Sequence, residues 1–284
     1  MGLLILLLGA SGFVGKSVLS ALGESAVTRD RIDLVTAPHS DLVELLDEVS
    51  PTAVVNCCGA TTGDAVELTR ANVIAVARLA TAMRTAAPGA RLVHVGSAAE
   101  YGSVPMGPAI TETSACRPVS DYGLTKLVAT ELLGSADGLE TVVLRLFNVI
   151  GPGAPPDSLP MRFAARLREE GDLVVGGLEV YRDFVDVRDA AAAIAAAATA
   201  EGPLPPVLNV GSGRATAVHD LIGTLVEIAS PGTRVLAGAQ GSPAVPWQCA
   251  DVTAVEGALG WRPERSLRTS LADLWASLEE VVPA

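Results

Sequence analysis

Cysteine and histidine are scarce in this sequence, and their positions do not suggest a metal site. The chain has four cysteines, at 57, 58, 116 and 249, and three scattered histidines. The cysteines lack the spacing of zinc ligands. Cys57 and Cys58 are adjacent in an apolar segment, where we expect them to pack in the interior. The sequence therefore predicts neither a metal centre nor a disulfide framework.

The chain also lacks long hydrophobic runs and an excess of positive charge. No run is long enough to cross a bilayer. The apolar start has no basic region and no cleavage site, and Gly9 interrupts it. The net charge of −12 disfavours binding to nucleic acid or to an anionic membrane surface. We therefore expect a cytoplasmic protein with neither of these partners, although a local positive site would still suffice for an anionic cofactor.

The first strong feature that is present is the stretch LLILLLGASGFVG at residues 3–15. Its apolar run is typical of a strand buried on both faces. Gly9 would allow a tight turn, Gly12 would let a pyrophosphate approach the backbone, and Gly15 would let the next helix pack closely. The N–H groups of that helix would face the phosphates. The pattern predicts a dinucleotide site, and the alternative is an ordinary glycine turn.

Strands and helices are expected to alternate over the first 150 residues. Strands are predicted at 3–8, 26–28, 32–35, 53–58, 91–95 and 141–146. Helices are predicted at 15–22, at 42–49 with Ser40 or Asp41 as cap, at 64–87, and around Tyr122 and Lys126. This succession indicates an α/β fold with a Rossmann-type doubly wound parallel sheet.

The composition changes after Asn148. The run GPGAPP at 151–156 is typical of a chain leaving a sheet. Helices are predicted at 158–170, 189–200, 217–229 and 267–281, and strands at 182–187 and 207–210 are expected to return to the main sheet. We therefore expect a dinucleotide-binding domain over 1–150 and, over 151–284, mostly a small C-terminal substrate-binding lobe.

Three residues have the chemistry of a proton-transfer site. Tyr122 and Lys126 are four apart on a predicted helix and share a face. A nearby ammonium lowers the pKa of a phenol and prepares it for acid or base catalysis. Ser97 follows a strand end, where α/β folds place ligands, and its hydroxyl could bind a carbonyl group. The alternative is an ordinary surface pair of Tyr122 and Lys126.

Several motifs resemble, as a set, the extended short-chain dehydrogenase/reductase family, the NAD-dependent epimerase/dehydratase group that acts on nucleotide sugars. The resemblance covers nearly the whole chain. The motifs are, in order, GASGFVG (9–15), SAAEYG (97–102), YGLTK (122–126), RLFNVIGPG (145–153), RDFVDVRD (182–189), NVGSG (209–213) and LGWRP (259–263).

The resemblance implies catalytic and substrate roles for five residues. Tyr122 would be the proton donor or acceptor, Lys126 would lower its pKa and hold the nicotinamide ribose, and Ser97 would orient the reacting group. Asn148 and Arg182 would contact the diphosphate of the substrate, since a guanidinium matches phosphate oxygens. The alternatives are a turn-capping role for Asn148 and an internal ion pair with Asp183 or Asp186 for Arg182.

The resemblance also implies a set of cofactor contacts. Arg29 and Arg31 would lie near the adenosine ribose, which favours NADP(H), whereas Asp30 between them leaves NAD(H) as the alternative. Asp33 and Leu34 resemble the pair that contacts adenine. The cofactor-binding residues are Gly9, Ser11, Gly12, Phe13, Val14, Gly15, Arg29, Asp33, Leu34, Cys58, Gly59, Ala60, Tyr122 and Lys126.

Departures from the family pattern narrow the reaction. Sugar 4,6-dehydratases typically carry Asp and Glu where this chain has Ala98 and Ala99, which cannot move a proton; Glu100 is expected to point elsewhere. The motifs look most like reductases of nucleotide-linked 4-keto-6-deoxyhexoses. The prediction is an NAD(P)H-dependent 4-ketoreductase of such a sugar. The alternatives are a sugar-nucleotide epimerase that recycles NAD and a reductase of a non-sugar carbonyl compound. A homodimer through helices near 64–87 and 121–134 is typical of relatives.

Overall fold

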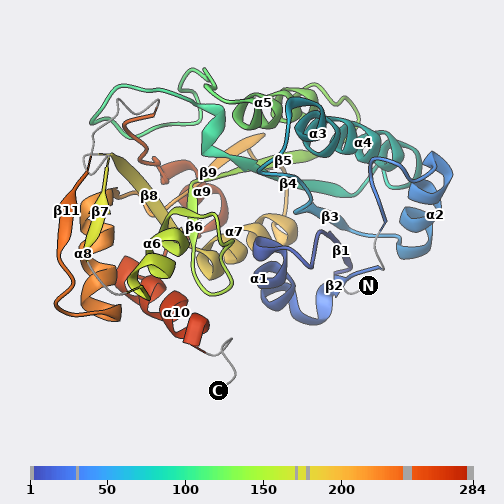
Figure 1. Ribbon diagram of the computed structural model, residues 1–284. Coiled ribbons are helices and arrows are strands. Elements are labelled where there is room, and N and C mark those ends of the chain that lie inside the picture. The colour runs from blue at the N-terminus through green and yellow to red at the C-terminus, as the bar shows by residue number, and fades with distance from the viewer. Residues whose placement is uncertain (1–2, 30–31, 170–171, 177–179, 239–244, 280–284) are drawn as a thin grey trace.

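A six-stranded parallel sheet forms the centre of the computed structural model, which describes residues 3–29, 32–169, 172–176, 180–238 and 245–279 (Figure 1). Every pairing within this sheet is parallel. The strand order is β2 (Ala26–Val27), β1 (Ile5–Leu8), β3 (Ala53–Asn56), β4 (Arg91–Ser97), β5 (Thr141–Leu146) and β9 (Val207–Val210). The order reverses direction at β1, which is where open α/β sheets bind ligands.

Helices cover both faces of this sheet because its strands are apolar on both sides. Ile5 and Leu7 face one core, and Leu6 and Leu8 face the other. The first core lies under α1 (Phe13–Leu22), α7 (Val187–Thr199) and α9 (Thr253–Leu259). The second lies under α2 (His39–Val49), α4 (Ala75–Ala86) and α5 (Asp121–Gly134). The predicted doubly wound sheet is therefore confirmed.

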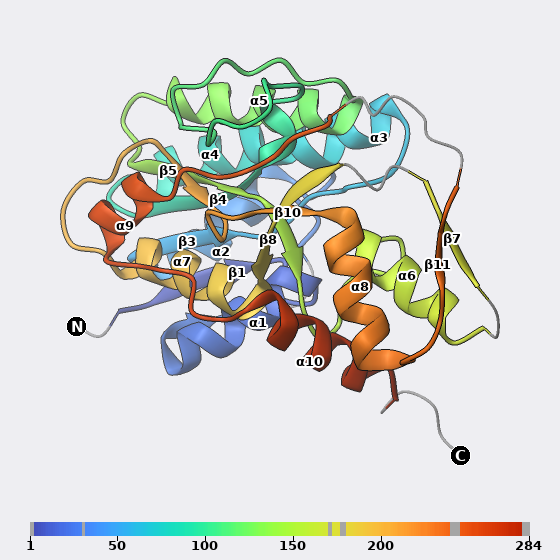
Figure 2. The same ribbon diagram turned by 90° about the vertical axis from the view of Figure 1, so that its left-hand side faces the viewer.

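A smaller lobe sits beside the sheet, around a third apolar core (Figure 2). Its helices are α6 (Leu159–Leu167), α8 (Val218–Ala229) and α10 (Leu267–Glu279). A three-stranded sheet joins β10 (Ala215–Ala217), β8 (Tyr181–Asp186) and β6 (Asn148–Ile150), and a two-stranded sheet joins β11 (Val235–Ala237) and β7 (Leu173–Val175). Across the described ranges, no helix is both long and apolar enough to cross a membrane.

Two strand predictions are wrong. Residues 182–187 do not return to the main sheet, because β9 occupies the edge beside β5 and β8 pairs with β6 and β10 instead. The strand 207–210 does return, as predicted. Residues 32–35 form no strand, and a turn covers residues 34–36. The Asp33 carboxylate accepts from the Val35 amide and the Thr36 hydroxyl, so local bonds replace a strand ladder.

Two helix predictions need correction. Helix α2 begins at His39, after Pro38, so neither Ser40 nor Asp41 is its cap. The predicted helix 64–87 is divided into α3 (Ala65–Thr69), a π-helix at Arg70–Ile74 and α4. The Asp64 capping box starts this helix as the sequence suggests. A π-turn inside a helix has no period that a sequence pattern reveals, and such turns are frequent at functional sites.

Candidate active site

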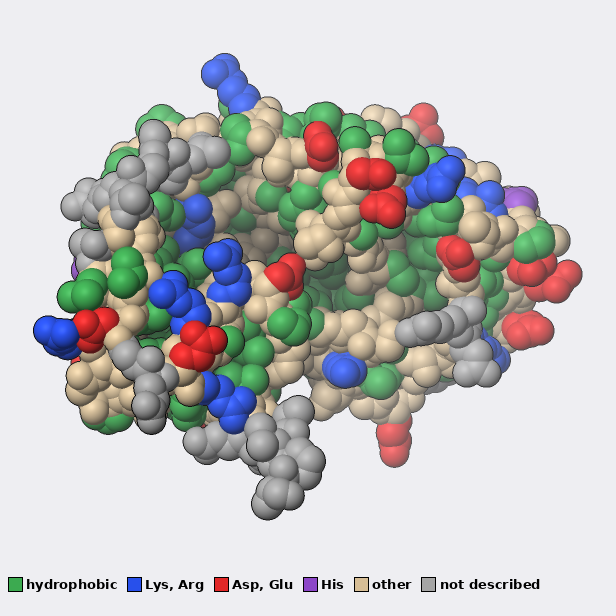
Figure 3. Space-filling view, in the orientation of Figure 1, with side chains coloured by type: hydrophobic (Ala, Val, Ile, Leu, Met, Phe, Trp, Pro, Cys, Tyr) green, Lys and Arg blue, Asp and Glu red, His purple; other side chains and the backbone are tan. Residues whose placement is uncertain are grey.

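A cavity of about 450 Å³ opens at the carboxyl ends of β1, β3 and β4, where the main sheet meets the small lobe. The space-filling view shows a hollow near the centre of the molecule (Figure 3). Of the predicted residues, the cavity is lined by Gly12, Phe13, Val14, Gly15, Cys58, Gly59, Ala60, Ser97, Tyr122 and Lys126. The fold thus brings the glycine stretch and all three proposed catalytic residues to one place.

In the turn after β1, Gly9 and Gly15 are required by the protein fold, whereas Gly12 is not. Gly9 has a φ of +79°, which favours glycine. A Cβ on Gly15 would lie 2.0 Å from the Gly9 carbonyl oxygen, so α1 could not pack there with any side chain. A Cβ on Gly12 would meet only that same oxygen, at 3.4 Å. The protein therefore requires glycine at 9 and 15, whereas at 12 the nearest space belongs to the cavity.

Helix α1 presents its N-terminus to this cavity without a side-chain cap. Its N-cap is Gly12, and no side chain accepts from the first turn. The free N–H groups and the positive end of the helix dipole suit phosphate oxygens. The first turn therefore has the donors that a pyrophosphate needs.

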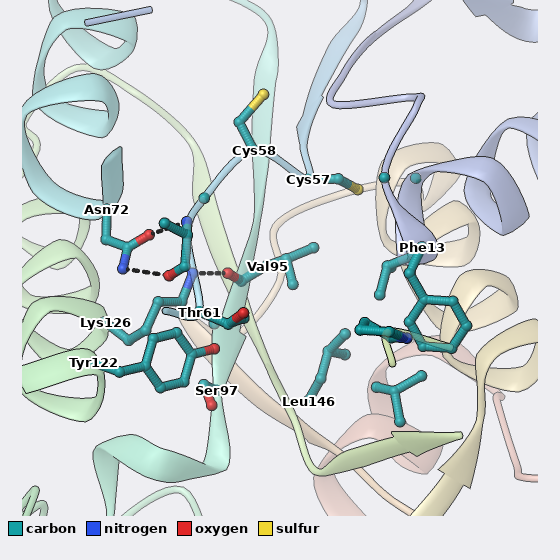
Figure 4. A pocket seen from close by; sticks show the side chains of 18 of the residues that line it. Phe13, Cys57, Cys58, Thr61, Asn72, Val95, Ser97, Tyr122, Lys126 and Leu146 are labelled. Atoms are coloured by element: carbon teal, nitrogen blue, oxygen red, sulfur yellow. Dashed lines mark hydrogen bonds between the residues drawn. The ribbon is translucent and has the colours of Figure 1, made fainter. Parts of the chain in front are cut away.

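Asn72 holds the loop after β3 in place, a role that the sequence pattern did not predict. It is 1% exposed. Its Oδ1 accepts from the Ala60 amide, and its Nδ2 donates to the Ala60 carbonyl, both at 2.9 Å, and to the Thr125 hydroxyl at 3.1 Å (Figure 4). Asn72 lies in the π-turn and itself lines the cavity. A poor helix former inside an apolar helical pattern was the available signal.

Ser97, Tyr122 and Lys126 lie together on one side of the cavity (Figure 4). Ser97 is the last residue of β4, and α5 supplies the other two. The helix begins beside the cavity because the Ser120 hydroxyl accepts from the Gly123 amide and caps it. The Lys126 Nζ donates to the Val95 carbonyl oxygen. The predicted i,i+4 face is thus an interior face and not a surface pair.

Burial is the largest cause of the pKa shifts of Tyr122 and Lys126. It raises the pKa of Tyr122 above its usual value, and hydrogen bonding with Ser97 only partly opposes this. Burial lowers the pKa of Lys126 to about 8, against the opposing effects of Glu100 and Cys57. Lys126 is not among the groups that shift the pKa of Tyr122 in this structure, where its ammonium donates to the Val95 carbonyl, so its expected effect on Tyr122 stays a prediction. Tyr122 is a protonated phenol at neutral pH, as a proton donor must be.

The two predicted diphosphate contacts do not line the cavity. Asn148 donates to the Asp183 carbonyl at 3.0 Å and to Gln248 at 3.1 Å. Arg182 donates to the Tyr181 carbonyl and, among the described residues, has no carboxylate partner. The alternative of an internal ion pair for Arg182 is therefore wrong.

Asp183 and Asp186 are occupied elsewhere. The Asp183 carboxylate accepts from the amides of Ser212, Gly213 and Ala250, and the Asp186 carboxylate binds Arg188 and Ser270. Burial lowers the pKa of the Arg182 guanidinium, which marks the cost of a cation without a counter-charge.

The adenosine end also lies outside the cavity lining. Arg29 is exposed beyond β2, and Asp30 and Arg31 fall outside the described residues. Hydrogen bonds from Thr36 and Val35 lower the pKa of Asp33. Arg78 on α4 donates to the Leu34 carbonyl at 2.9 Å and holds this loop against the second core. Gly9 and Ser11 likewise do not border the cavity.

Further lining residues come from loops and strand ends, some of them inside the motif at 145–153, that were not named as site residues. One of them, Ser158, has a buried hydroxyl oxygen with no hydrogen-bond partner, which indicates a place for a polar ligand. The lining residues that sequence reasoning missed are Cys57, Thr61, Asn72, Val95, Gly96, Leu146, Phe147, Val149, Pro155, Asp157 and Ser158.

Comparison with known proteins decides the family. The sequence profile described as "NAD dependent epimerase/dehydratase family" matches residues 5–211. The chain belongs to the NAD dependent epimerase/dehydratase family. It is therefore an NAD(P)-dependent enzyme of the oxidoreductase and epimerase type. The open first turn of α1 and the space at Gly12 fit such a cofactor.

Two relatives and one solved structure match along nearly their whole length. The dTDP-6-deoxy-L-talose 4-dehydrogenase (NAD(P)(+)) of Kitasatospora kifunensis is 35% identical, with 96% of this chain and 95% of that protein covered. The GDP-6-deoxy-D-mannose reductase of Pseudomonas aeruginosa is 29% identical, with 96% of each covered. The structure of RMD from Pseudomonas aeruginosa complexed with NADPH superposes with a TM-score of 0.88 at 26% identity, covering 99% of both chains.

Proposed function

We propose that this enzyme reduces the C4 carbonyl of a nucleotide-diphosphate 4-keto-6-deoxy sugar with NAD(P)H. The observation that carries the proposal is the convergence of Ser97, Tyr122 and Lys126 on the cavity that the glycine stretch also lines. Two relatives support the substrate class, since they act on 6-deoxyhexoses linked to dTDP and GDP. Ala98 and Ala99 supply no acid or base for water elimination, which disfavours dehydration.

The mechanism follows from the protonation of the site. A bound reduced nicotinamide supplies hydride to C4. The Tyr122 hydroxyl gives its proton to the oxygen that becomes a hydroxyl, and its raised pKa ensures that the proton is present. The Ser97 hydroxyl holds the carbonyl. The Lys126 ammonium stabilises the phenolate left on Tyr122 and binds the nicotinamide ribose.

We propose NADP(H) as the preferred cofactor, with NAD(H) as the alternative. Arg29 is exposed at the end of β2, where a cation would suit a 2′-phosphate. The relative of known structure was complexed with NADPH. Comparison of kcat/KM for NADPH and NADH, in the wild type and in Arg29→Ala, tests this preference.

The small lobe is proposed to bind the nucleotide sugar, with Arg182 as a diphosphate contact. A partly buried guanidinium without a carboxylate partner among the described residues is costly, and a diphosphate would offset that cost. Reaching the diphosphate requires the Arg182 side chain to turn toward the cavity. We expect Arg182→Met to raise KM for the nucleotide sugar at least tenfold, with NADPH affinity unchanged. An unchanged KM would remove Arg182 from the site.

The proposed reaction is tested by NAD(P)H oxidation against a panel of dTDP- and GDP-linked 4-keto-6-deoxyhexoses, with product configuration read by NMR. Tyr122→Phe, which removes only the hydroxyl, should lower kcat by 100-fold or more while NADPH affinity stays within about threefold. Near-normal turnover in this variant would contradict the assignment. Sugar interconversion without net cofactor consumption would support the epimerase alternative, and activity on simple carbonyl compounds alone would support the non-sugar alternative.

A homodimer is also proposed, through the outer faces of α3 to α5. Leu124 and Val128 on α5 are 50% and 40% exposed, and Val66 on α3 and Ile74 in the π-turn are exposed as well. These helices contact one another, so their apolar side chains form one surface of the molecule. Burying such a surface against a second copy would remove it from water.

A further inference from the structure

Glu100 is a fully buried carboxylate directly behind the proposed catalytic residues. It is 0% exposed and does not line the cavity, as the sequence led us to expect. Its Oε1 accepts from the Ser97 amide at 2.8 Å. Its Oε2 accepts from Arg145 Nε at 2.7 Å and from the Thr130 hydroxyl at 2.8 Å. The carboxylate therefore joins the end of β4 to β5 and α5.

The surroundings of Glu100 hold this carboxylate in one position. Gly96 leaves room for it, since a Cβ there would lie 2.9 Å from Glu100 Oε1. Thr130 lies one helical turn after Lys126 and also donates to the Lys126 carbonyl at 3.2 Å. The Arg145 guanidinium stacks on the Tyr101 ring, 4.6 Å from its centroid, and so cannot turn away freely. Each neighbour of the carboxylate is thus itself fixed.

We propose that Glu100 is a positioning residue of the catalytic site, which fixes the backbone of Ser97 and, through Thr130, the helical turn that carries Lys126, and which places a negative charge behind both. The proposal rests on the proposed function, because it assigns Ser97 and Lys126 the roles given there. The Glu100 carboxylate forms a buried ion pair with Arg145 and accepts from two further donors, the Ser97 amide and the Thr130 hydroxyl.

The charges around the site determine in which direction Glu100 shifts the pKa values of Lys126 and Tyr122. Glu100 and Cys57 are the groups that raise the pKa of Lys126 against burial, and the nearby His94 is held neutral by burial and by Lys126. Glu100 also raises the pKa of Tyr122. The Glu100 charge also acts on Arg145 and Cys116, which in turn interact with Tyr101 and Glu131. Removing the charge of Glu100 therefore lowers the pKa of Lys126 and of Tyr122 together.

The decisive variant is Glu100→Gln, which keeps the shape and removes the charge. Reduction needs Tyr122 and Lys126 protonated, so we expect the alkaline limb of the kcat/KM profile to move about one pH unit lower. Glu100→Asp keeps the charge but shortens the reach to Ser97, and should restore the limb while kcat stays reduced. Thr130→Val, which leaves the carboxylate in place, is the matched control and should not move the limb.

A second readout does not depend on activity. The absorbance of tyrosinate, titrated in the wild type and in Tyr122→Phe, isolates Tyr122 from Tyr101 and Tyr181. Glu100→Gln should lower that titration midpoint in the same direction as the pH profile. Failure of every sugar in the panel would remove the proposed function, yet the phenol titration would still test Glu100.

Two outcomes would overturn the proposal: an unchanged alkaline limb, or an unchanged phenol midpoint, in a folded Glu100→Gln protein. If the unpaired Arg145 prevents folding, the double variant Glu100→Gln/Arg145→Met removes both charges at similar volume. Folding is checked by circular dichroism and Tm. The double variant should show the same downward shift of both midpoints, and their constancy would refute the role.

Discussion

At the scale of a single residue, Lys126 lowers the free energy of unfolding, because its ammonium is buried at the place where we propose that it acts. The side chain is 4% exposed, and burial moves its pKa from 10.5 to about 8. Between these values the unfolded chain binds the proton and the folded chain does not, so stability rises with pH over that window. Below about pH 8 both states are protonated, and the full cost of burial is present. That cost is on the order of 3 kcal/mol.

Lys126→Met should therefore stabilise the protein at pH 7 while it abolishes turnover. Met keeps the apolar stem and removes the buried charge, but it also loses the bond to the Val95 carbonyl, which costs about 1 kcal/mol. We expect a net gain of about 1–2 kcal/mol in the free energy of unfolding at pH 7. Urea unfolding at pH 7 and 9.5 should show the gain shrinking at the higher pH. A variant less stable than the wild type at pH 7 would contradict this account.

At the scale of an element, the glycines of the turn between β1 and α1 have different roles in the fold and in the cavity. Gly15 is required by packing, because its Cβ would overlap the Gly9 carbonyl. Gly12 is under no such constraint from the protein itself. The element is thus built so that one glycine serves the fold and another leaves space for a ligand.

Gly12→Ala should fold with a Tm close to that of the wild type but bind NADPH at least tenfold more weakly. Gly15→Ala should be destabilised by about 3 kcal/mol, on the scale of severe overpacking. Gly89→Ala, where a Cβ would meet open space, is the matched control for the chemical change. Fluorescence titration with NADPH and thermal unfolding separate the two effects. Normal NADPH affinity in Gly12→Ala would show that the turn does not contact the cofactor.

At the scale of the whole molecule, the cavity lies where the main sheet meets the small lobe, and the two parts are joined by fixed polar contacts. The Asp183 carboxylate in β8 accepts from the amides of Ser212, Gly213 and Ala250. These bonds join β8 to the loop after β9 and to the segment around Ala250. The outer faces of α3 to α5 lie away from this lobe (Figure 1) and carry four of the exposed apolar side chains, Val66, Ile74, Leu124 and Val128. The proposed substrate site and the proposed dimer interface therefore lie on different sides of the molecule.

Leu124→Glu should convert the proposed dimer into a monomer, because a charge at the centre of an apolar contact is left without a partner. Sedimentation velocity at micromolar concentration measures the change. Leu19→Glu on α1, also an exposed leucine, is the matched control and should leave the assembly unchanged. A wild-type protein that sediments as a monomer would refute the interface.

The sequence by itself determined the doubly wound sheet and the meeting of Ser97, Tyr122 and Lys126. Both follow from local rules, since apolar runs and glycine spacing set the strands and an i,i+4 spacing sets a helix face. Neighbouring parallel strands then bring their carboxyl ends to the same edge.

Only the tertiary structure decided the environment of these residues. The sheet that takes β8, the bonds from Asn72 to Ala60 and the raised pKa of Tyr122 depend on contacts between segments far apart in the chain. Burial and the charge of Glu100 have no local sequence signature, because both arise from what packs around a side chain in three dimensions.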